Sequence, residues 1–174
     1  MAASGLDDKH EVAVWDWEAY PKVGQLHAPL AHGNSSRANI LSLAFNPSSD
    51  LVIATCVKEV VFMSFMDGVI KGKIGSGWGP TGPETTLSQA FVGDILFTGL
   101  FSGDIAAWSG TDLSRRNKAH KGRVNSLYSS NSLPNKLLSG GYDGLVILWA
   151  VNGTGLTSEK QFSLKEPSIR SMNP

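Results

Sequence analysis

The sequence predicts an all-β fold, and three observations support this prediction. Glycine contributes 19 of the 174 residues, well above the share of about 7% found in an average protein. Apolar residues make up 41% of the chain but charged residues only 17%, which suits a packed core with a weakly charged surface. Short apolar runs bounded by turn residues recur along the chain, as is typical of turn-dense β proteins.

The tryptophan positions reveal an internal repeat. Trp15, Trp108 and Trp149 each end a short apolar run, and the last two are 41 positions apart. The 93 positions between Trp15 and Trp108 leave room for two units of about 46. The middle copy is expected near residue 62, where residues 59–65 form a similar run with Met63 or Ser64 in place of the tryptophan.

Each complete unit contains four expected strands. They cover residues 40–45, 51–55, 60–65 and 69–74, then 87–91, 95–98, 105–108 and 113–117, and finally 123–128, 136–139, 145–149 and 161–164. Four short antiparallel strands per period of this length are typical of a β-propeller blade. The sequence therefore predicts a partial propeller of about three and a half four-stranded blades.

The expected organisation leaves the propeller incomplete. We expect an N-terminal tail over residues 1–10, a blade remnant over 11–31, blades over about 32–84, 85–117 and 118–165, and the start of a further blade over 166–174, with a strand at 168–172. Closed rings have about four to eight blades, so this arc leaves one blade side exposed. Two explanations stay open: a longer chain supplies the missing blades, which we favour, or the ring closes with a partner.

The last unit carries a specific polar pattern. His120, Ser139 and Asp143 precede Trp149 by 29, ten and six positions. This spacing resembles that of the WD-repeat family. The resemblance implies that the four side chains form a buried hydrogen-bonded network, here called the tetrad, which fixes the strand register of the blade.

The other two units keep less of this pattern. The second has Thr98 and Trp108 but Ser102 where the aspartate is expected. The first lacks the tryptophan and the aspartate, and we expect Thr55 to supply its hydroxyl and His32 its histidine.

His120, Ser139 and Asp143 are also the residue types of a hydrolase triad, which is the competing interpretation. Such an enzyme is expected to carry its serine on a strained G-x-S-x-G turn, whereas Ser139 lies inside a predicted strand. We therefore predict a structural tetrad and no catalytic residue. Cys56 is the only cysteine and the four histidines are scattered, so no metal site and no cofactor are expected.

The order of the motifs narrows the resemblance. Residues 15–17 (Trp-Asp-Trp), 102–104 (Ser-Gly-Asp), 118–122 (Lys-Ala-His-Lys-Gly) and 138–141 (Leu-Ser-Gly-Gly) are arranged as in the echinoderm microtubule-associated protein-like family, in the middle of its first propeller. The resemblance covers about residues 8–172. It implies a non-enzymatic microtubule-associated scaffold in the cytoplasm and cytoskeleton, with tubulin as partner. A general WD-repeat adaptor with other protein partners is the alternative.

The charges cancel overall but are separated along the chain. Lys and Arg number 15, as do Asp and Glu, yet no acidic residue lies between Asp112 and Asp143. We call five basic residues in this interval the basic segment: Arg115, Arg116, Lys118, Lys121 and Arg123. It is a candidate docking patch for an acidic surface such as the tubulin tails, or simply a solvated loop.

Two other partner classes are not expected. Nucleic acid is disfavoured because no aromatic residue interleaves with the basic segment in the sequence to stack on bases. A membrane is disfavoured because no run approaches the ~20 apolar residues that a spanning helix needs.

Overall fold

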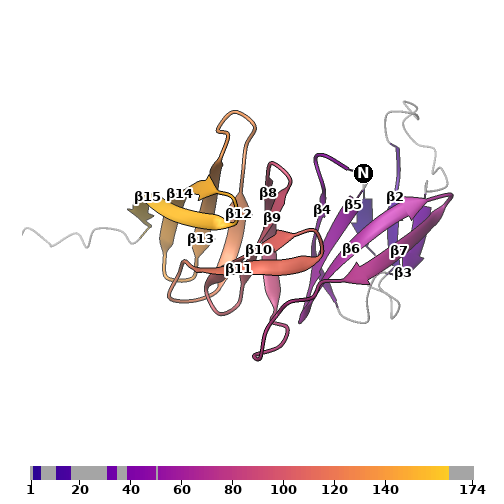
Figure 1. Cartoon of the computed structure of the whole chain (residues 1–174), viewed down its shortest axis with the longest axis horizontal. Helices are drawn as coiled ribbons and strands as arrows, with labels where there is room; N and C mark the ends of the chain where they lie inside the picture. Colours follow the sequence, from indigo (N-terminus) through magenta and orange to yellow (C-terminus); the bar gives the residue numbers. More distant parts are fainter. Residues whose placement is uncertain (1, 5–10, 17–30, 35–38, 50, 165–174) are drawn as a thin grey trace, which may run out of the picture.

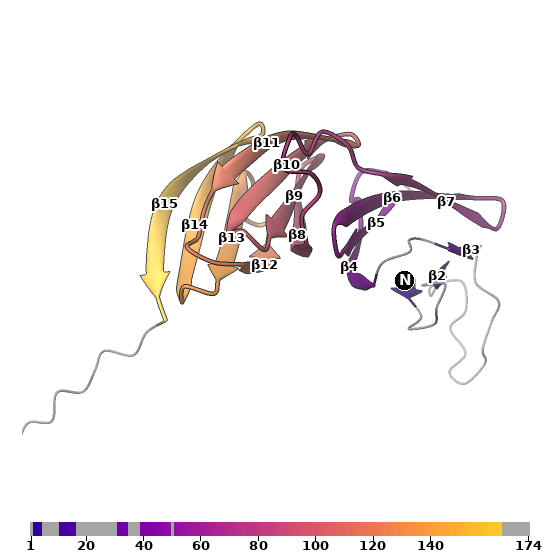
Figure 2. The same cartoon turned by 90° about the horizontal axis from the view of Figure 1, so that it is seen from below.

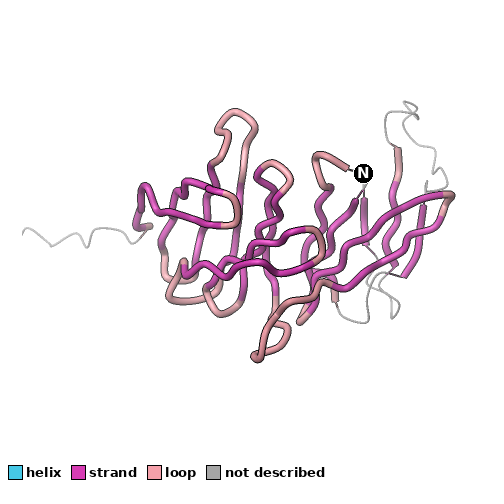
Figure 3. The backbone as a smooth tube through the Cα atoms, in the orientation of Figure 1, coloured by secondary structure: helices cyan, strands magenta, loops and turns pink. Residues whose placement is uncertain are grey.

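A computed structural model of the chain describes residues 2–4, 11–16, 31–34, 39–49 and 51–164. The regular elements in these ranges are fifteen β-strands arranged in three sheets (Figures 1 and 3). No stretch of the described chain forms a helix long and apolar enough to cross a membrane. The all-β prediction is confirmed.

Two of the sheets are separate four-stranded antiparallel blades. The second blade has the order β11-β10-β9-β8 and consists of β8 (Thr86–Val92), β9 (Ile95–Leu100), β10 (Asp104–Ser109) and β11 (Asp112–Lys118). The third blade has the order β12-β13-β14-β15 and consists of β12 (Val124–Tyr128), β13 (Lys136–Gly141), β14 (Leu145–Asn152) and β15 (Gly155–Ser163). Figure 2 shows that the blades follow one another along an open arc.

The first blade belongs to a larger, seven-stranded sheet. Its four strands are β4 (Ile40–Phe45), β5 (Leu51–Cys56), β6 (Glu59–Met66) and β7 (Val69–Ile74). Three N-terminal strands, here called the N-terminal cap, continue the sheet beyond β7: β1 (Ala2–Ser4), β2 (Glu11–Val14) and β3 (Ala31–Asn34). The link between cap and blade is parallel, through the single pair His32 and Val69.

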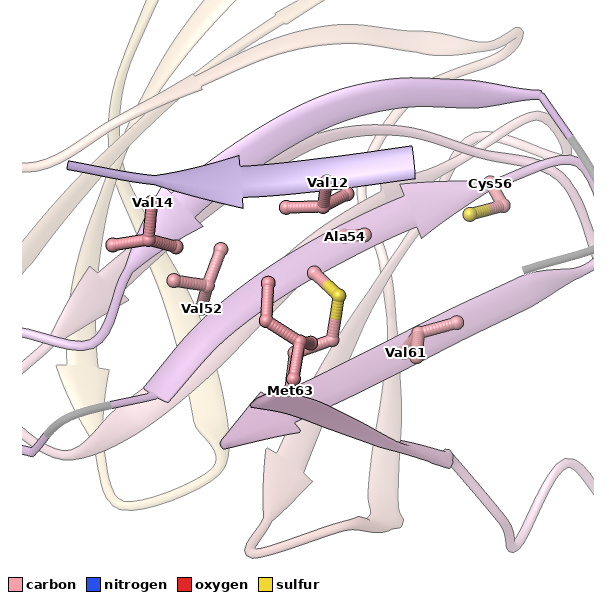
Figure 4. Packing of buried hydrophobic residues seen from close by; sticks show 8 residues of the cluster. Val12, Val14, Val52, Ala54, Cys56, Val61 and Met63 are labelled. Atoms are coloured by element: carbon pink, nitrogen blue, oxygen red, sulfur yellow. The ribbon is translucent and has the colours of Figure 1, made fainter. Parts of the chain in front are cut away.

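The N-terminal cap covers one side of the first blade. Val12 and Val14 of β2 are buried in one cluster with Val52, Ala54 and Met63 (Figure 4). The sequence suggested a tail over residues 1–10 and a separate remnant over 11–31, but β1 within the expected tail pairs with β2. The strands fold back because the apolar side of the blade would otherwise face water.

Two further apolar clusters lie between the blades. Ile53, Val60 and Phe62 of the first blade pack against the second blade around Trp108. Trp78, in the Gly- and Pro-rich connection after β7, also joins this cluster, with its ring centroid 5.2 Å from that of Trp108 in an edge-to-face arrangement. The second cluster joins the second and third blades, and Trp149 is its largest member.

The predicted strands correspond closely to the observed ones, with one clear difference at the end. The last strand was expected at residues 161–164, but β15 begins at Gly155. Asn152 pairs directly with Gly155, and Gly153 between them has a φ of 56°. This two-residue turn lets β15 pair along the whole of β14. The strand expected at residues 168–172 lies outside the described residues.

Candidate interaction site and the polar network beneath it

The four tetrad residues of the third blade lie in one continuous hydrogen-bonded chain. The Trp149 Nε1–H donates to Ser139 Oγ over 2.8 Å. Ser139 Oγ lies 2.8 Å from His120 Nε2, and His120 Nδ1 lies 2.9 Å from Asp143 Oδ1. A neutral imidazole with its proton on Nδ1 satisfies every member, since it accepts from the serine hydroxyl and donates to the carboxylate.

Asp143 also anchors the backbone around the network. Its Oδ2 accepts from the Lys121 N–H at 3.0 Å, and its Oδ1 accepts from the Leu145 N–H at 3.1 Å. Burial by itself would raise the pKa of Asp143. The Lys121 N–H, the His120 imidazole and the Leu145 N–H outweigh this effect and hold the pKa below its ordinary value. The aspartate thus ties the β11–β12 loop to the β13–β14 turn in its ionised form.

The burial and hydrogen bonds of the tetrad argue against the hydrolase interpretation. Ser139 is 1% exposed and the His120 side chain is 0% exposed, so neither is open to a substrate. The serine oxygen also accepts the indole N–H, which opposes its use as a nucleophile. The arrangement is suited to holding strands together.

The second blade keeps half of this network and replaces the rest. Its Trp108 Nε1–H donates to Thr98 Oγ1 over 2.9 Å, as expected from the sequence. Ser102 occupies the aspartate position, and its hydroxyl accepts from Arg116 Nη2 at 3.2 Å. Arg116 also bridges to Glu84 and Asp104, at 2.6 and 3.2 Å. An ionic cluster therefore stands where the third blade has its histidine and aspartate.

The first blade does not hold Thr55 where the sequence placed it. In the second blade Ala90 pairs with Phe97 and Gln89 with Thr98. In the first blade the corresponding pairs are Ala44 with Ile53 and Leu43 with Ala54. Ala54 therefore occupies the position that Thr98 holds in the second blade. Met63, one of the two residues expected in place of the tryptophan, lies on the same side of the sheet, beneath the N-terminal cap.

Thr55 follows Ala54 on β5, so its side chain points to the opposite side of the sheet, toward the second blade. It is buried, and its hydroxyl has no hydrogen-bond partner among the described residues. The expected histidine, His32, has its backbone in β3, while its side chain lies outside what the structure describes.

Thr55→Val is expected to raise the stability of the chain by about 1 kcal/mol, because a methyl group replaces a buried hydroxyl that lacks a partner. Thr98→Val is the matched control, and it should lower stability by about 1–2 kcal/mol because it strands the Trp108 N–H. Urea denaturation of both variants measures the difference. Equal destabilisation by the two substitutions would contradict the assignment.

The structure divides the basic segment into two parts. Arg115, Arg116 and Lys118 lie on β11, where Arg116 and Lys118 form ion pairs with acidic residues from outside the segment. Lys121 and Arg123 lie in the β11–β12 loop and are exposed. No ion pair among the described residues involves these two cations or Arg115, which is also exposed.

Two exposed aromatic residues flank this loop. Phe101 in the β9–β10 turn is 56% exposed and Tyr142 in the β13–β14 turn is 69% exposed. The Arg123 guanidinium carbon lies 4.7 Å from the centroid of the Tyr142 ring, a cation–π contact. We call Phe101, Lys121, Arg123 and Tyr142 the platform.

Backbone hydrogen bonds fix the three loops of the platform to one another. The His120 N–H donates to the Gly103 carbonyl, and the Tyr142 N–H donates to the Arg123 carbonyl, both at 2.9 Å. The tetrad also joins two of these loops, the β11–β12 loop and the β13–β14 turn. A surface held in this way loses little conformational entropy when a partner binds.

The aromatic half of the platform lies outside the basic segment, since residues 115–123 contain no Phe, Trp or Tyr. The positions of the two aromatic residues in the sequence could have identified them. Phe101 and Tyr142 each directly precede the polar turn residue of their blade, Ser102 or Asp143. In the folded chain, exposed aromatic residues from two neighbouring turns therefore accompany these charges, contrary to the expectation from the sequence.

Comparisons with known proteins agree with this architecture. The family model of the WD domain, G-beta repeat, matches residues 112–150. The β-propeller domain of Myceliophteria thermophila Cps50 (Swd1) superposes with a TM-score of 0.72 at 14% identity, over 89% of this chain and 53% of that one. The RRP9 WD40 repeats superpose with a TM-score of 0.61 at 18% identity, over 74% of this chain and 39% of that one.

A curated relative is similar in sequence over most of the chain. Echinoderm microtubule-associated protein-like 4 of Xenopus tropicalis is 27% identical over 84% of this chain, which spans 17% of that protein's length. The three antiparallel blades, the repeat match and the propeller neighbours lead to one conclusion about the architecture. The chain is an incomplete β-propeller of the WD-repeat type.

Proposed function

We propose that the chain is a non-enzymatic protein-interaction scaffold that binds its partner at the platform. The observation that supports this most strongly is that backbone hydrogen bonds join three turns that carry two exposed aromatic residues and two cations. These cations form no ion pair among the described residues. The tetrad is, in this proposal, the structural support of the platform rather than a catalytic centre.

The chemistry of the platform fits an acidic peptide segment that carries an apolar or aromatic side chain. Lys121 and Arg123 attract carboxylates, while Phe101 and Tyr142 offer ring surface of the kind enriched at protein interfaces. A nucleic acid fits less well, since tight binders make about 6–10 phosphate contacts and the platform offers two cations.

Tubulin is the specific partner that we propose, in the cytoplasm and on the cytoskeleton. The named relative is a microtubule-associated protein-like protein, which supports this choice, and acidic tails match the charge of the platform. The alternative is an adaptor for other acidic partners, and it uses the same four residues.

Microtubule co-sedimentation tests the proposal. The parent chain is expected to pellet with microtubules and to do so less at higher salt, because exposed charges are screened within about 8–10 Å. The double variant Lys121→Ser, Arg123→Ser should bind several-fold more weakly. The control is Lys71→Ser, Lys73→Ser, which removes the same charge from exposed positions on β7.

The same assay also distinguishes tubulin from other acidic partners. Microtubules whose acidic tails have been cleaved should no longer pellet the parent chain. Equal pelleting by the parent and both double variants would overturn the role of the platform. If the parent fails to pellet with intact microtubules, tubulin is excluded and the adaptor alternative replaces it.

A further inference from the structure

A pocket of about 260 Å³ opens between the second and third blades, and we call it the loop pocket. Its walls come mainly from the end of β8 with the β8–β9 turn and from the β12–β13 loop, which rise from the same edge of the molecule in Figure 1. These connections join the ends of β9 and β13 that are opposite to the β9–β10 and β13–β14 turns. The loop pocket therefore lies on the face opposite to the platform.

The loop pocket exists because the third blade departs from the second at this edge. The β8–β9 turn has two residues, whereas the β12–β13 loop has seven. Gln89 and Leu127 each pair with the residue that supplies the hydroxyl group of its blade, so Phe91 and Ser129 occupy corresponding positions. A small side chain thus stands where the second blade has an aromatic ring, and the longer loop forms a wall beside it. Longer loops on a fixed scaffold are where binding residues concentrate.

Backbone hydrogen bonds hold the β12–β13 loop in a defined shape. The Leu133 N–H donates to the Ser130 carbonyl over 3.0 Å, and the Ser132 N–H donates to Ser130 Oγ over 3.2 Å. The Asn135 carbonyl accepts from the Val151 N–H over 2.9 Å, which fixes the end of the loop to β14. Leu133 is nevertheless 53% exposed where it lines the pocket. An apolar side chain that an ordered loop holds toward water is suited to contact a partner.

The lining combines apolar surface with uncharged hydrogen-bonding groups. Phe91 and Leu133 provide apolar surface, while Ser129, Asn131 and Asn135 provide a hydroxyl and two amides. These three polar side chains make no hydrogen bond to another described residue. Hydroxyl and amide groups both donate and accept hydrogen bonds, so they match the N–H and C=O groups of a peptide backbone.

Size and charge narrow the class of ligand. The volume is just below the roughly 300–1,000 Å³ of pockets that enclose a free small molecule, so it suits one or two side chains of a larger partner. Among the described residues that line the pocket only Lys136 is charged, and it is paired with Glu159. Asp94 follows the lining residue Gly93 in the β8–β9 turn, is exposed, and forms no ion pair with any described residue. The free charge beside the pocket is therefore a carboxylate, which favours a cationic partner.

We propose that the loop pocket binds a peptide segment of a partner protein in which an apolar side chain lies beside a lysine or arginine. The apolar side chain contacts Phe91 and Leu133, the backbone of the segment meets the amides and the hydroxyl of the loop, and the cation pairs with Asp94. The platform attracts the opposite charge on the opposite face, so the scaffold holds two partners of different chemistry. The inference does not rest on the role of the platform, because the two sites share no residue.

NMR titration of the ¹⁵N-labelled full chain tests the proposal, with the blocked peptide acetyl-Ser-Arg-Leu-Ser-amide as the probe at up to about 5 mM. The backbone amide signals of Gly93, Ser130 and Leu133 are expected to shift and to saturate, whereas those of Lys121 and Arg123 should stay in place. Glutamate in place of the arginine of the peptide should weaken binding about two- to fivefold. Glycine in place of its leucine should weaken binding about fivefold or more.

Substitutions in the chain test the apolar part of the loop pocket. Ser129→Phe introduces the side chain that the second blade carries at this position, so it should fill the pocket and abolish saturable binding. Leu133→Ser should weaken binding about fivefold or more, because it removes the exposed apolar contact. Ile74→Ser is the matched control, since this aliphatic side chain is 56% exposed but lies on β7 of the first blade, and it should leave binding unchanged. Well-dispersed amide signals show that each variant is folded.

Asp94→Asn tests the charge preference. It should abolish the difference in affinity between the arginine and the glutamate peptide. A parent chain whose loop-pocket signals show no saturable shift overturns the proposal. Unchanged binding by Ser129→Phe also overturns it, because the peptide then binds elsewhere. Equal affinity of the parent chain for the arginine and glutamate peptides overturns it as well, because the carboxylate then has no part in binding.

Discussion

Asp143→Ala is expected to lower the free energy of unfolding by about 2–3 kcal/mol. The substitution removes the acceptor of the buried His120 Nδ1–H and also of the Lys121 and Leu145 backbone N–H groups. An unsatisfied buried donor costs about 1–3 kcal/mol. Urea denaturation measures the loss. Asp94→Ala is the control, because Asp94 is exposed in the β8–β9 turn and its replacement should change stability by less than about 0.5 kcal/mol.

The contribution of Asp143 should also depend on pH in a defined direction. Its pKa is lower in the folded chain than the ordinary value of about 3.9, so its ionised form stabilises the fold above that pH. The stability difference between the parent and Asp143→Asn should be fully present near pH 5. It should shrink as the pH falls below about 4 and the carboxylate takes up a proton. A difference that grows on acidification would contradict the proposed role of the ionised aspartate.

Gly103→Ala is expected to destabilise the chain by about 3 kcal/mol. Gly103 has a φ of 97°, and a Cβ there would contact the carbonyl oxygen of His120 and lie 2.7 Å from that of Gly122. Positive φ costs a non-glycine residue about 1–2 kcal/mol, and overpacking against backbone adds about 1–3 kcal/mol. The substitution should therefore also loosen the platform, because it pushes the β9–β10 turn away from the β11–β12 loop.

Gly110 provides the control for this experiment. It also has a positive φ, 59°, but a Cβ there would meet nothing within 4 Å. Gly110→Ala should therefore cost only the backbone strain, about 1 kcal/mol. Thermal and urea denaturation of both variants separate strain from collision, and equal losses would show that the close approach of the two loops has no energetic weight.

The spacing of the tryptophans predicted the blades well because each blade repeats the same alternation of buried and turn residues. The grouping of the tetrad residues was implied by the resemblance to the WD-repeat family, and the structure brings the four side chains into one hydrogen-bonded chain. The error at Thr55 has a simple physical cause. Thr55 and Val60 pair across four residues, whereas Gly99 and Ile105 pair across five. The shorter turn puts the hydroxyl position nine residues before Met63, at Ala54, instead of ten residues before the tryptophan. Thr55 is the neighbouring residue, and its side chain points to the other side of the strand.

The N-terminal cap and the platform could not be derived from spacing alone. Val12 and Val14 identify a strand but not which surface it covers, because the parallel pair between β3 and β7 joins residues far apart in the chain. Similarly, the ion pairs of Arg116 with Glu84 and Asp104 form only when β11, β10 and the connection before β8 come together. A linear count of charge therefore overestimated the free basic surface.

The two apolar clusters between the blades have a consequence for how the chain transmits perturbations. The second blade contributes residues to both clusters, whereas the first blade contributes to one of them and the third blade to the other. The molecule is thus a short linear array with nearest-neighbour coupling, in which stability is the sum of unit terms and interface terms. A disturbance in the first or third blade removes one interface term and leaves the remaining pair intact. A disturbance in the second blade removes both terms at once, so the folding of the two outer blades is coupled only through the middle one.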